Sequence, residues 1–100
     1  MKSISTDELN DKVEAGDELH IIDVRETDEV ETGMIPGAKH IPLGELPERT
    51  RELDPDKQYY LVCQAGGRSA KAAEHLESNG FHSVNVEGGM SSWRGVTVYG

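Results

Sequence analysis

Residues 59–69 read Tyr59-Tyr60-Leu61-Val62-Cys63-Gln64-Ala65-Gly66-Gly67-Arg68-Ser69, a strand pattern that runs into a glycine-bearing turn. The aromatic and β-branched run before Cys63 is typical of a buried strand, and a helical pattern follows from Ser69 to about Asn79. This order places the Cys63 thiol in front of free backbone N–H groups and the positive end of a helix dipole. We therefore predict that Cys63 ionises easily and acts as a nucleophile.

The alternative is that Cys63 is a small hydrophobic residue filling the end of a core strand, which is the commoner role of a lone cysteine. The neighbouring residues favour the reactive interpretation. Gly66, Gly67 and Arg68 supply the tight turn and the positive charge that an anion-binding loop needs.

Strand and helix patterns alternate along the rest of the chain. The patterns predict strands at 20–24, 39–42 and 83–86, helices at 6–15, 27–33 and 46–53, and a last helical turn carrying Trp93. Strands separated by helices indicate an α/β fold with a mainly parallel sheet and helices on both faces. The functional site of such a sheet lies beyond the carboxyl ends of its strands, where Cys63 and the segments 23–25 and 87–89 fall.

The composition favours one globular domain. The chain has 100 residues, of which 35% are hydrophobic and 29% charged, and this size fits a single modest core. A formal net charge of −9 argues against nucleic acid or an anionic membrane as a partner. The single cysteine precludes an internal disulfide, and the sequence has neither a signal-peptide core nor an apolar run of transmembrane length, so we expect a cytoplasmic protein.

Four motifs resemble, in order and spacing, those of the rhodanese (sulfurtransferase) family. They are Asp23-Val24-Arg25, the segment Gly33-Met34-Ile35-Pro36-Gly37-Ala38-Lys39-His40-Ile41-Pro42, the segment 62–69, and Gly88-Gly89 with Trp93. Each motif alone is weak, but four in register between about residues 4 and 94 are specific. The resemblance implies a single rhodanese domain over residues 1–100 with the family's five-stranded parallel sheet. It also implies that Cys63 accepts a sulfane sulfur as a persulfide and passes it to a thiophilic acceptor. Residues 96–100 lie beyond the motifs and carry no prediction.

A thiolate and a persulfide are both anions, so the loop after Cys63 has to stabilise negative charge. Its backbone N–H groups do this without a metal or an organic cofactor if they point at the sulfur. The expected binding residues are Gln64, Ala65, Gly66, Gly67, Arg68 and Ser69. We expect Gly66 and Gly67 to provide backbone angles or clearance. Arg68 is expected to hold an anionic donor such as thiosulfate, or alternatively to cover the loop through a backbone or carboxylate contact. Ser69 is expected to cap the helix and line the pocket.

A second group of residues is expected to support the site. Asp23 and Arg25 are interpreted as a bracing pair rather than as an acid–base dyad, because a carboxylate beside the thiolate would raise the thiol pKa. Gly88 and Gly89 are expected to allow close approach of the backbone to the loop, and Trp93 to form a packed wall.

Other polar residues are expected to have no part in the chemistry. The four histidines, at positions 20, 40, 75 and 82, lack metal-ligand spacing. The acidic runs Asp28-Glu29 and 45–52 are interpreted as solvated helix faces or, alternatively, as surfaces that face a basic partner.

Two other functions remain open. Cysteine-dependent phosphatases and arsenate reductases also combine a thiolate with an arginine, but in the pattern Cys-x5-Arg. Only four residues separate Cys63 from Arg68, and the shorter loop suits a single sulfur better than a tetrahedral oxyanion. A catalytically silent binding module is the other alternative, although it would have no chemical reason to keep Cys63, Gly67 and Arg68. The expected partners are a small-molecule or protein persulfide donor, or thiosulfate, and a thiol or cyanide acceptor.

Overall fold

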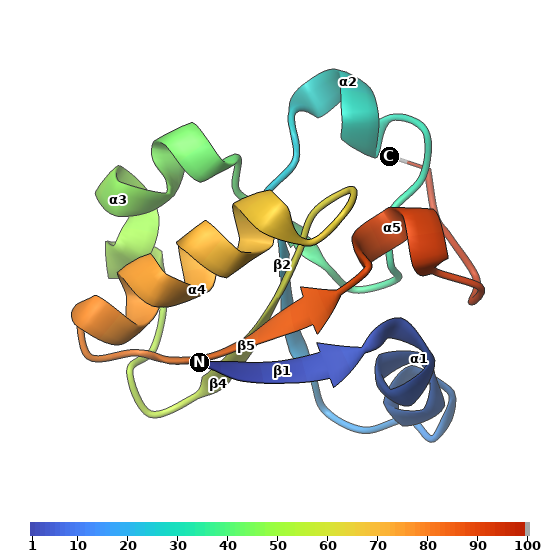
Figure 1. Ribbon diagram of the computed structural model, residues 1–100, viewed down its shortest axis with the longest axis horizontal. Coiled ribbons are helices and arrows are strands. Elements are labelled where there is room, and N and C mark those ends of the chain that lie inside the picture. Colours follow the sequence, from blue (N-terminus) through green and yellow to red (C-terminus); the bar gives the residue numbers. More distant parts are fainter. Residues whose placement is uncertain (100) are drawn as a thin grey trace.

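The computed structural model describes residues 1–99 as a sheet with helices packed on it (Figure 1). In chain order, the elements are β1 (Lys2–Ser5), α1 (Thr6–Glu14), β2 (His20–Asp23), α2 (Thr27–Val30), β3 (Lys39–His40), α3 (Leu46–Arg49), β4 (Gln58–Val62), α4 (Gly67–Ser78), β5 (His82–Glu87) and α5 (Gly89–Ser92). Short 3-10 turns, Leu43–Glu45 and Thr50–Glu52, lie on either side of α3. Gly100 lies outside the described residues.

The five strands form one sheet in the order β1-β5-β4-β2-β3, and every neighbouring pair is parallel. The expected five-stranded parallel α/β architecture is therefore confirmed. β4 is the central strand, with Leu61 in register with Ile22 of β2 on one side and with Asn85 of β5 on the other. Since all strands run the same way, their carboxyl ends meet at one edge of the sheet, and Cys63 follows the middle strand there.

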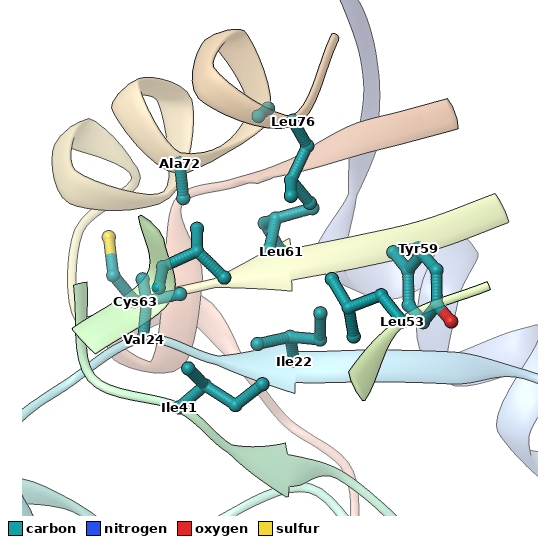
Figure 2. Close-up of a cluster of buried hydrophobic side chains, with 11 residues drawn as sticks. Ile22, Val24, Ile41, Leu53, Tyr59, Leu61, Cys63, Ala72 and Leu76 are labelled. Carbon is teal, nitrogen blue, oxygen red and sulfur yellow. The ribbon is translucent and has the colours of Figure 1, made fainter. Parts of the chain in front are cut away.

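The alternating side chains of the strands build a core on each face of the sheet. Tyr59, Leu61 and Cys63 face α3 and α4, in a cluster that includes Leu46 and Ala72 (Figure 2). The other face carries a second cluster, in which Tyr60, Val62, Val84 and Val86 pack with residues of α1 and α5. Helices therefore cover both faces, and Cys63 ends a row of side chains on the α4 face.

The first strand has no periodic signal in the sequence. Only Ile4 of β1 is buried, because the strand lies at the sheet edge, and its pairing partner Val86 is 82 positions away. Ser5 caps the following helix: its hydroxyl accepts a hydrogen bond from the Glu8 amide at 3.1 Å. α1 then ends at Glu14, ahead of Gly16.

One helix begins before the expected residue. α4 starts at Gly67 instead of Ser69, because Gly66 adopts a left-handed conformation (φ 105°) as its N-cap. α2 begins at Thr27 as expected but ends at Val30 instead of residue 33, and Glu26 caps it through reciprocal hydrogen bonds with Glu29. The shift matters at α4, since the loop that follows β4 is only four residues long.

The C-terminal segment returns to the body of the protein. Val98 and Met34 exchange backbone hydrogen bonds of 2.8 and 2.9 Å in an antiparallel bridge. Trp93 donates its indole N–H to the Val96 carbonyl at 3.1 Å. Within residues 1–99, no helix has the length and apolar character needed to cross a membrane.

Candidate active site

Cys63 lies directly after β4, with its sulfur beside the first turn of α4 (Figure 2). The residue is 1% exposed. Its Sγ accepts a hydrogen bond from the Gly66 amide at 3.0 Å, and the thiol donates to Ser69 Oγ at 3.3 Å. Cys63 is thus both a core residue and the centre of a polar loop, which combines the two interpretations that the sequence set against each other.

The loop conformation depends on Gly66 and not on Gly67. Gly66 has a φ of 105°, and a Cβ there would stand 3.3 Å from the Gly88 amide nitrogen. Gly67 has no left-handed backbone, and a Cβ built on it would meet nothing within 4 Å. The expectation that Gly67 provides a special angle or clearance is therefore wrong: it is simply the first residue of α4.

The start of α5 is pressed against the same loop. The Met90 amide donates to the Cys63 carbonyl at 2.8 Å, and the Ser91 amide donates to the Gln64 carbonyl at 2.9 Å. A Cβ on Gly89 would collide with the Cys63 carbonyl and come within 2.8 Å of the Gln64 backbone. The expected close approach at Gly88-Gly89 is present, and only glycine at position 89 permits it.

Two opposing effects act on the Cys63 thiol. Burial raises its pKa, because a thiolate loses hydration. Hydrogen bonds from the Ser69 hydroxyl and from the Ser69, Gly66 and Ala65 amides favour the thiolate and outweigh burial, so the pKa of Cys63 lies below its ordinary value. The loop therefore favours the thiolate form of a sulfur that is buried from bulk water.

Ser69 connects the thiol to Asn85, a residue that sequence reasoning missed. The Ser69 hydroxyl donates to Asn85 Oδ1 at 2.6 Å, and both side chains are buried. The available signal was the alternation of strand 83–86, in which the polar residues Ser83 and Asn85 face α4, opposite to Val84 and Val86. The partner of Asn85, Ser69, lies in the first turn of α4, 16 residues earlier, and no local pattern connects the two.

The structure brings Asp23 and Arg25 together as expected. Arg25 Nη2 lies 2.9 Å from Asp23 Oδ2, and the two side chains are 1% and 0% exposed. Arg25 also donates to the Gly33 carbonyl at 2.8 Å and to Gln64 Oε1 at 3.2 Å. The pair ties the loop after β2 to the loop after β4, and Gln64 points its side chain toward Arg25.

Arg68 forms a bidentate ion pair with Glu29 of α2. Its Nη1 and Nη2 donate to the two carboxylate oxygens at 2.6 and 2.7 Å. Of the two roles considered for Arg68, the carboxylate contact is the one present. The expectation that Glu29 belongs to a solvated helix face is wrong, because its side chain is only 27% exposed and is fully engaged. The hydrogen bonds from Arg68 and from the Glu26 backbone hold the pKa of Glu29 at about 2.

Trp93 lies on the other side of the sheet from the thiol. It packs against the cluster that contains Val62 and Val86, while Cys63 belongs to the cluster on the α4 face. Trp93 is therefore a wall of the core, and it reaches the site only through α5. Among residues 1–99, no group of three or more histidine, cysteine or acidic side chains is arranged to hold a metal ion.

Known proteins resemble this chain over nearly its whole length. The family described as Rhodanese-like domain matches residues 5–95. "Putative sulfurtransferase YtwF" of Bacillus subtilis is 50% identical over 97 residues, which are 97% of this chain and 94% of that protein. "Putative sulfur carrier protein YrkF" of the same organism is 43% identical over 94% of this chain and 51% of that protein. The crystal structure of a rhodanese-like domain protein from Staphylococcus aureus superposes with a TM-score of 0.94 at 44% identity, covering 100% of this chain and 99% of that one. The chain therefore belongs to the rhodanese sulfurtransferase family.

Proposed function

We propose that the protein moves a sulfane sulfur from a donor to a thiophilic acceptor through a persulfide on Cys63. The observation that carries this proposal is the position of Cys63 beside the start of α4: the residue is 1% exposed, its Sγ accepts a hydrogen bond from the Gly66 amide at 3.0 Å, and its pKa is lowered. A thiolate of this kind is nucleophilic, and the same amides stabilise the persulfide anion that replaces it.

Both half-reactions conserve atoms and charge. With thiosulfate, the Cys63 thiolate attacks the sulfane sulfur, the S–S bond of the donor breaks with its electron pair going to sulfite, and Cys63–S–S⁻ remains. With cyanide as acceptor, the carbon attacks the outer sulfur, thiocyanate leaves, and the Cys63 thiolate is regenerated. A thiol acceptor gives a hydropersulfide in the same way. Neither half-reaction needs an external oxidant or reductant.

Loop size favours sulfur transfer over phosphoryl transfer. β4 ends at Val62 and α4 begins at Gly67, so only four residues surround the sulfur. In a phosphate-binding loop, the arginine must be free to donate hydrogen bonds to the oxyanion. Here both terminal nitrogens of Arg68 donate to Glu29 instead. The site thus suits one added sulfur atom better than a tetrahedral anion.

Asp23, Arg25, Gly88 and Gly89 act in this proposal by holding the loop. The Arg25 contact to Gln64 and the α5 amides fix the loop backbone from two sides. Preorganised amides stabilise an anion without a reorganisation cost at the moment of reaction. These residues need not touch the donor or the acceptor.

Mass spectrometry of the intact protein tests the proposal. Incubation with thiosulfate or with cysteine hydropersulfide should add one sulfur atom to the wild type, and cyanide should then remove it as thiocyanate. Cys63→Ser should gain no sulfur from either donor, whereas Ser78→Ala, a change at the exposed last residue of α4, should load normally. If the wild type loads with neither donor, the silent-module alternative holds. Hydrolysis of aryl phosphates that depends on Cys63 would instead support the phosphatase alternative.

A further inference from the structure

The ion pair between Glu29 and Arg68 is built into the fold. Glu29 Oε1 accepts the Glu26 amide at 3.0 Å, and the Glu29 carbonyl accepts hydrogen bonds from Thr32 Oγ1 at 2.6 Å and from Arg25 Nη1 at 3.3 Å. The carboxylate that meets Arg68 is therefore held in place by α2 itself. A surface ion pair without such anchoring would open at little cost.

This pair neutralises the positive charge of Arg68, which lies in the first turn of α4 beside the active-site loop. The Arg68 guanidinium interacts electrostatically with Cys63 and Glu26 as well as with Glu29. The other nearby guanidinium, Arg25, is buried against Asp23. The charges around the loop thus sum to a negative value once Cys63 is ionised.

Thiosulfate and hydropersulfides differ in how strongly the negative charge around the loop opposes their binding. Thiosulfate arrives as a dianion and leaves sulfite, another dianion, so both the bound donor and the leaving group need a free cation. A hydropersulfide, R–S–SH, presents an outer sulfur that is uncharged when protonated. The Cys63 thiolate attacks that sulfur, the S–S bond breaks toward R–S⁻, and the proton passes to the leaving thiolate to give R–SH and Cys63–S–S⁻.

We infer that Glu29 is a specificity-determining residue: by occupying the guanidinium of Arg68, it disfavours thiosulfate and makes hydropersulfides the preferred donor class. This inference rests on the proposed sulfur transfer through Cys63. Glu29 does not touch the reacting sulfur and acts through Arg68, so its removal changes which donor binds, and leaves the thiolate chemistry in place.

Glu29→Gln is the decisive variant, because the amide oxygen keeps the hydrogen bond from the Glu26 backbone while the charge is lost. Asp28→Asn is the matched control: it removes the same charge from the preceding, exposed residue of α2. The rate of sulfur loading on Cys63 is measured by mass spectrometry at limiting donor, with thiosulfate and with cysteine hydropersulfide. Circular dichroism and the melting temperature report whether each variant is folded.

Wild-type protein should load from the hydropersulfide about tenfold or more faster than from thiosulfate. Glu29→Gln should accelerate loading from thiosulfate by about tenfold, the effect of one charge-assisted contact, and change hydropersulfide loading less than about twofold. Asp28→Asn should change both rates less than about twofold. In an Arg68→Ala background, Glu29→Gln should give a much smaller gain, because no guanidinium is released.

Several results would overturn the inference while leaving the proposed function intact. They are equal acceleration of both donors, an equal effect of Asp28→Asn, an undiminished gain in the Arg68→Ala background, or a wild type that prefers thiosulfate. If Glu29→Gln does not fold, Glu29→Asp is measured instead: its carboxylate is one methylene too short for the bidentate contact, and thiosulfate loading should still rise. Loading of the wild type by neither donor would refute the proposed function itself.

Discussion

The hydroxyl of Ser69 donates to Asn85 Oδ1 at 2.6 Å inside the protein, directly behind the sulfur of Cys63. A hydroxyl has one proton, and Ser69 can donate it to Asn85 or to the Cys63 thiolate. The two acceptors therefore compete, and the charge on residue 85 controls how well Ser69 supports the thiolate.

Asn85→Asp should raise the pKa of Cys63. A carboxylate at this position draws the Ser69 proton toward itself and repels the thiolate, so a smaller fraction of the cysteine is ionised at neutral pH. The rate of alkylation by iodoacetamide between pH 5 and 10 measures the pKa directly. Asn79→Asp, the same change at the exposed end of α4, should leave the profile where it is in the wild type. A profile for Asn85→Asp that matches the wild type would mean that Asn85 has no influence on the thiol.

The lowered pKa of Cys63 should appear in the pH dependence of stability. Between the folded pKa and the ordinary thiol value of about 8.5, the unfolded chain binds more protons at Cys63 than the folded protein does. The contribution of Cys63 to stability is therefore complete above that ordinary value and is lost as the pH falls through the folded pKa. The melting temperature of the wild type, minus that of Cys63→Ser, should increase from pH 6 to pH 9. A difference that is flat or falls over this range contradicts a lowered pKa.

Asp23→Asn should destabilise the protein by about 3–5 kcal/mol, since it leaves the Arg25 guanidinium buried without a counter-charge. Asp7→Asn is a matched control, because Asp7 pairs with Arg94 at 2.7 Å but at side-chain exposures of 59% and 77%. Breaking that exposed pair should lower the free energy of unfolding far less, because water already screens both charges. Urea denaturation gives both free energies of unfolding. Equal losses for the two variants would show that burial does not set the value of the Asp23 pair.

Gly89→Ala should cost about 2–4 kcal/mol and slow sulfur loading. The added methyl group has to displace the Cys63 carbonyl and the Gln64 backbone, on top of a left-handed φ of 57°. Gly37→Ala shares the left-handed backbone, at 80°, but its methyl group meets nothing within 4 Å. It should cost about 1–2 kcal/mol and leave loading unchanged. If both variants unfold at the same urea concentration, the close packing of α5 on the loop contributes nothing measurable.

The sequence alone determined the features that arise from neighbouring residues. The apolar run before Cys63, the glycine at position 66 and the helical pattern after it are local signals, and they predicted a strand, a tight loop and a helix around a reactive thiol. Two further contacts join residues that are close in sequence: Ser5 and Glu8 are three positions apart, and Asp23 and Arg25 are two positions apart. The parallel sheet followed from the alternation of strands and helices, which forces crossover connections.

Only the tertiary structure decided which distant residues complete the site. Glu29 and Arg68 are 39 positions apart, and Ser69 and Asn85 are 16 apart, so no periodicity connects them. The edge strand β1 has one buried residue and forms only by pairing with β5. Gly67 lost its expected role because Gly66 alone makes the turn. Local sequence sets backbone preferences, but contacts between elements depend on how the sheet and helices pack, and at this site packing has paired Arg68, in the first turn of α4, with the carboxylate of Glu29 in α2.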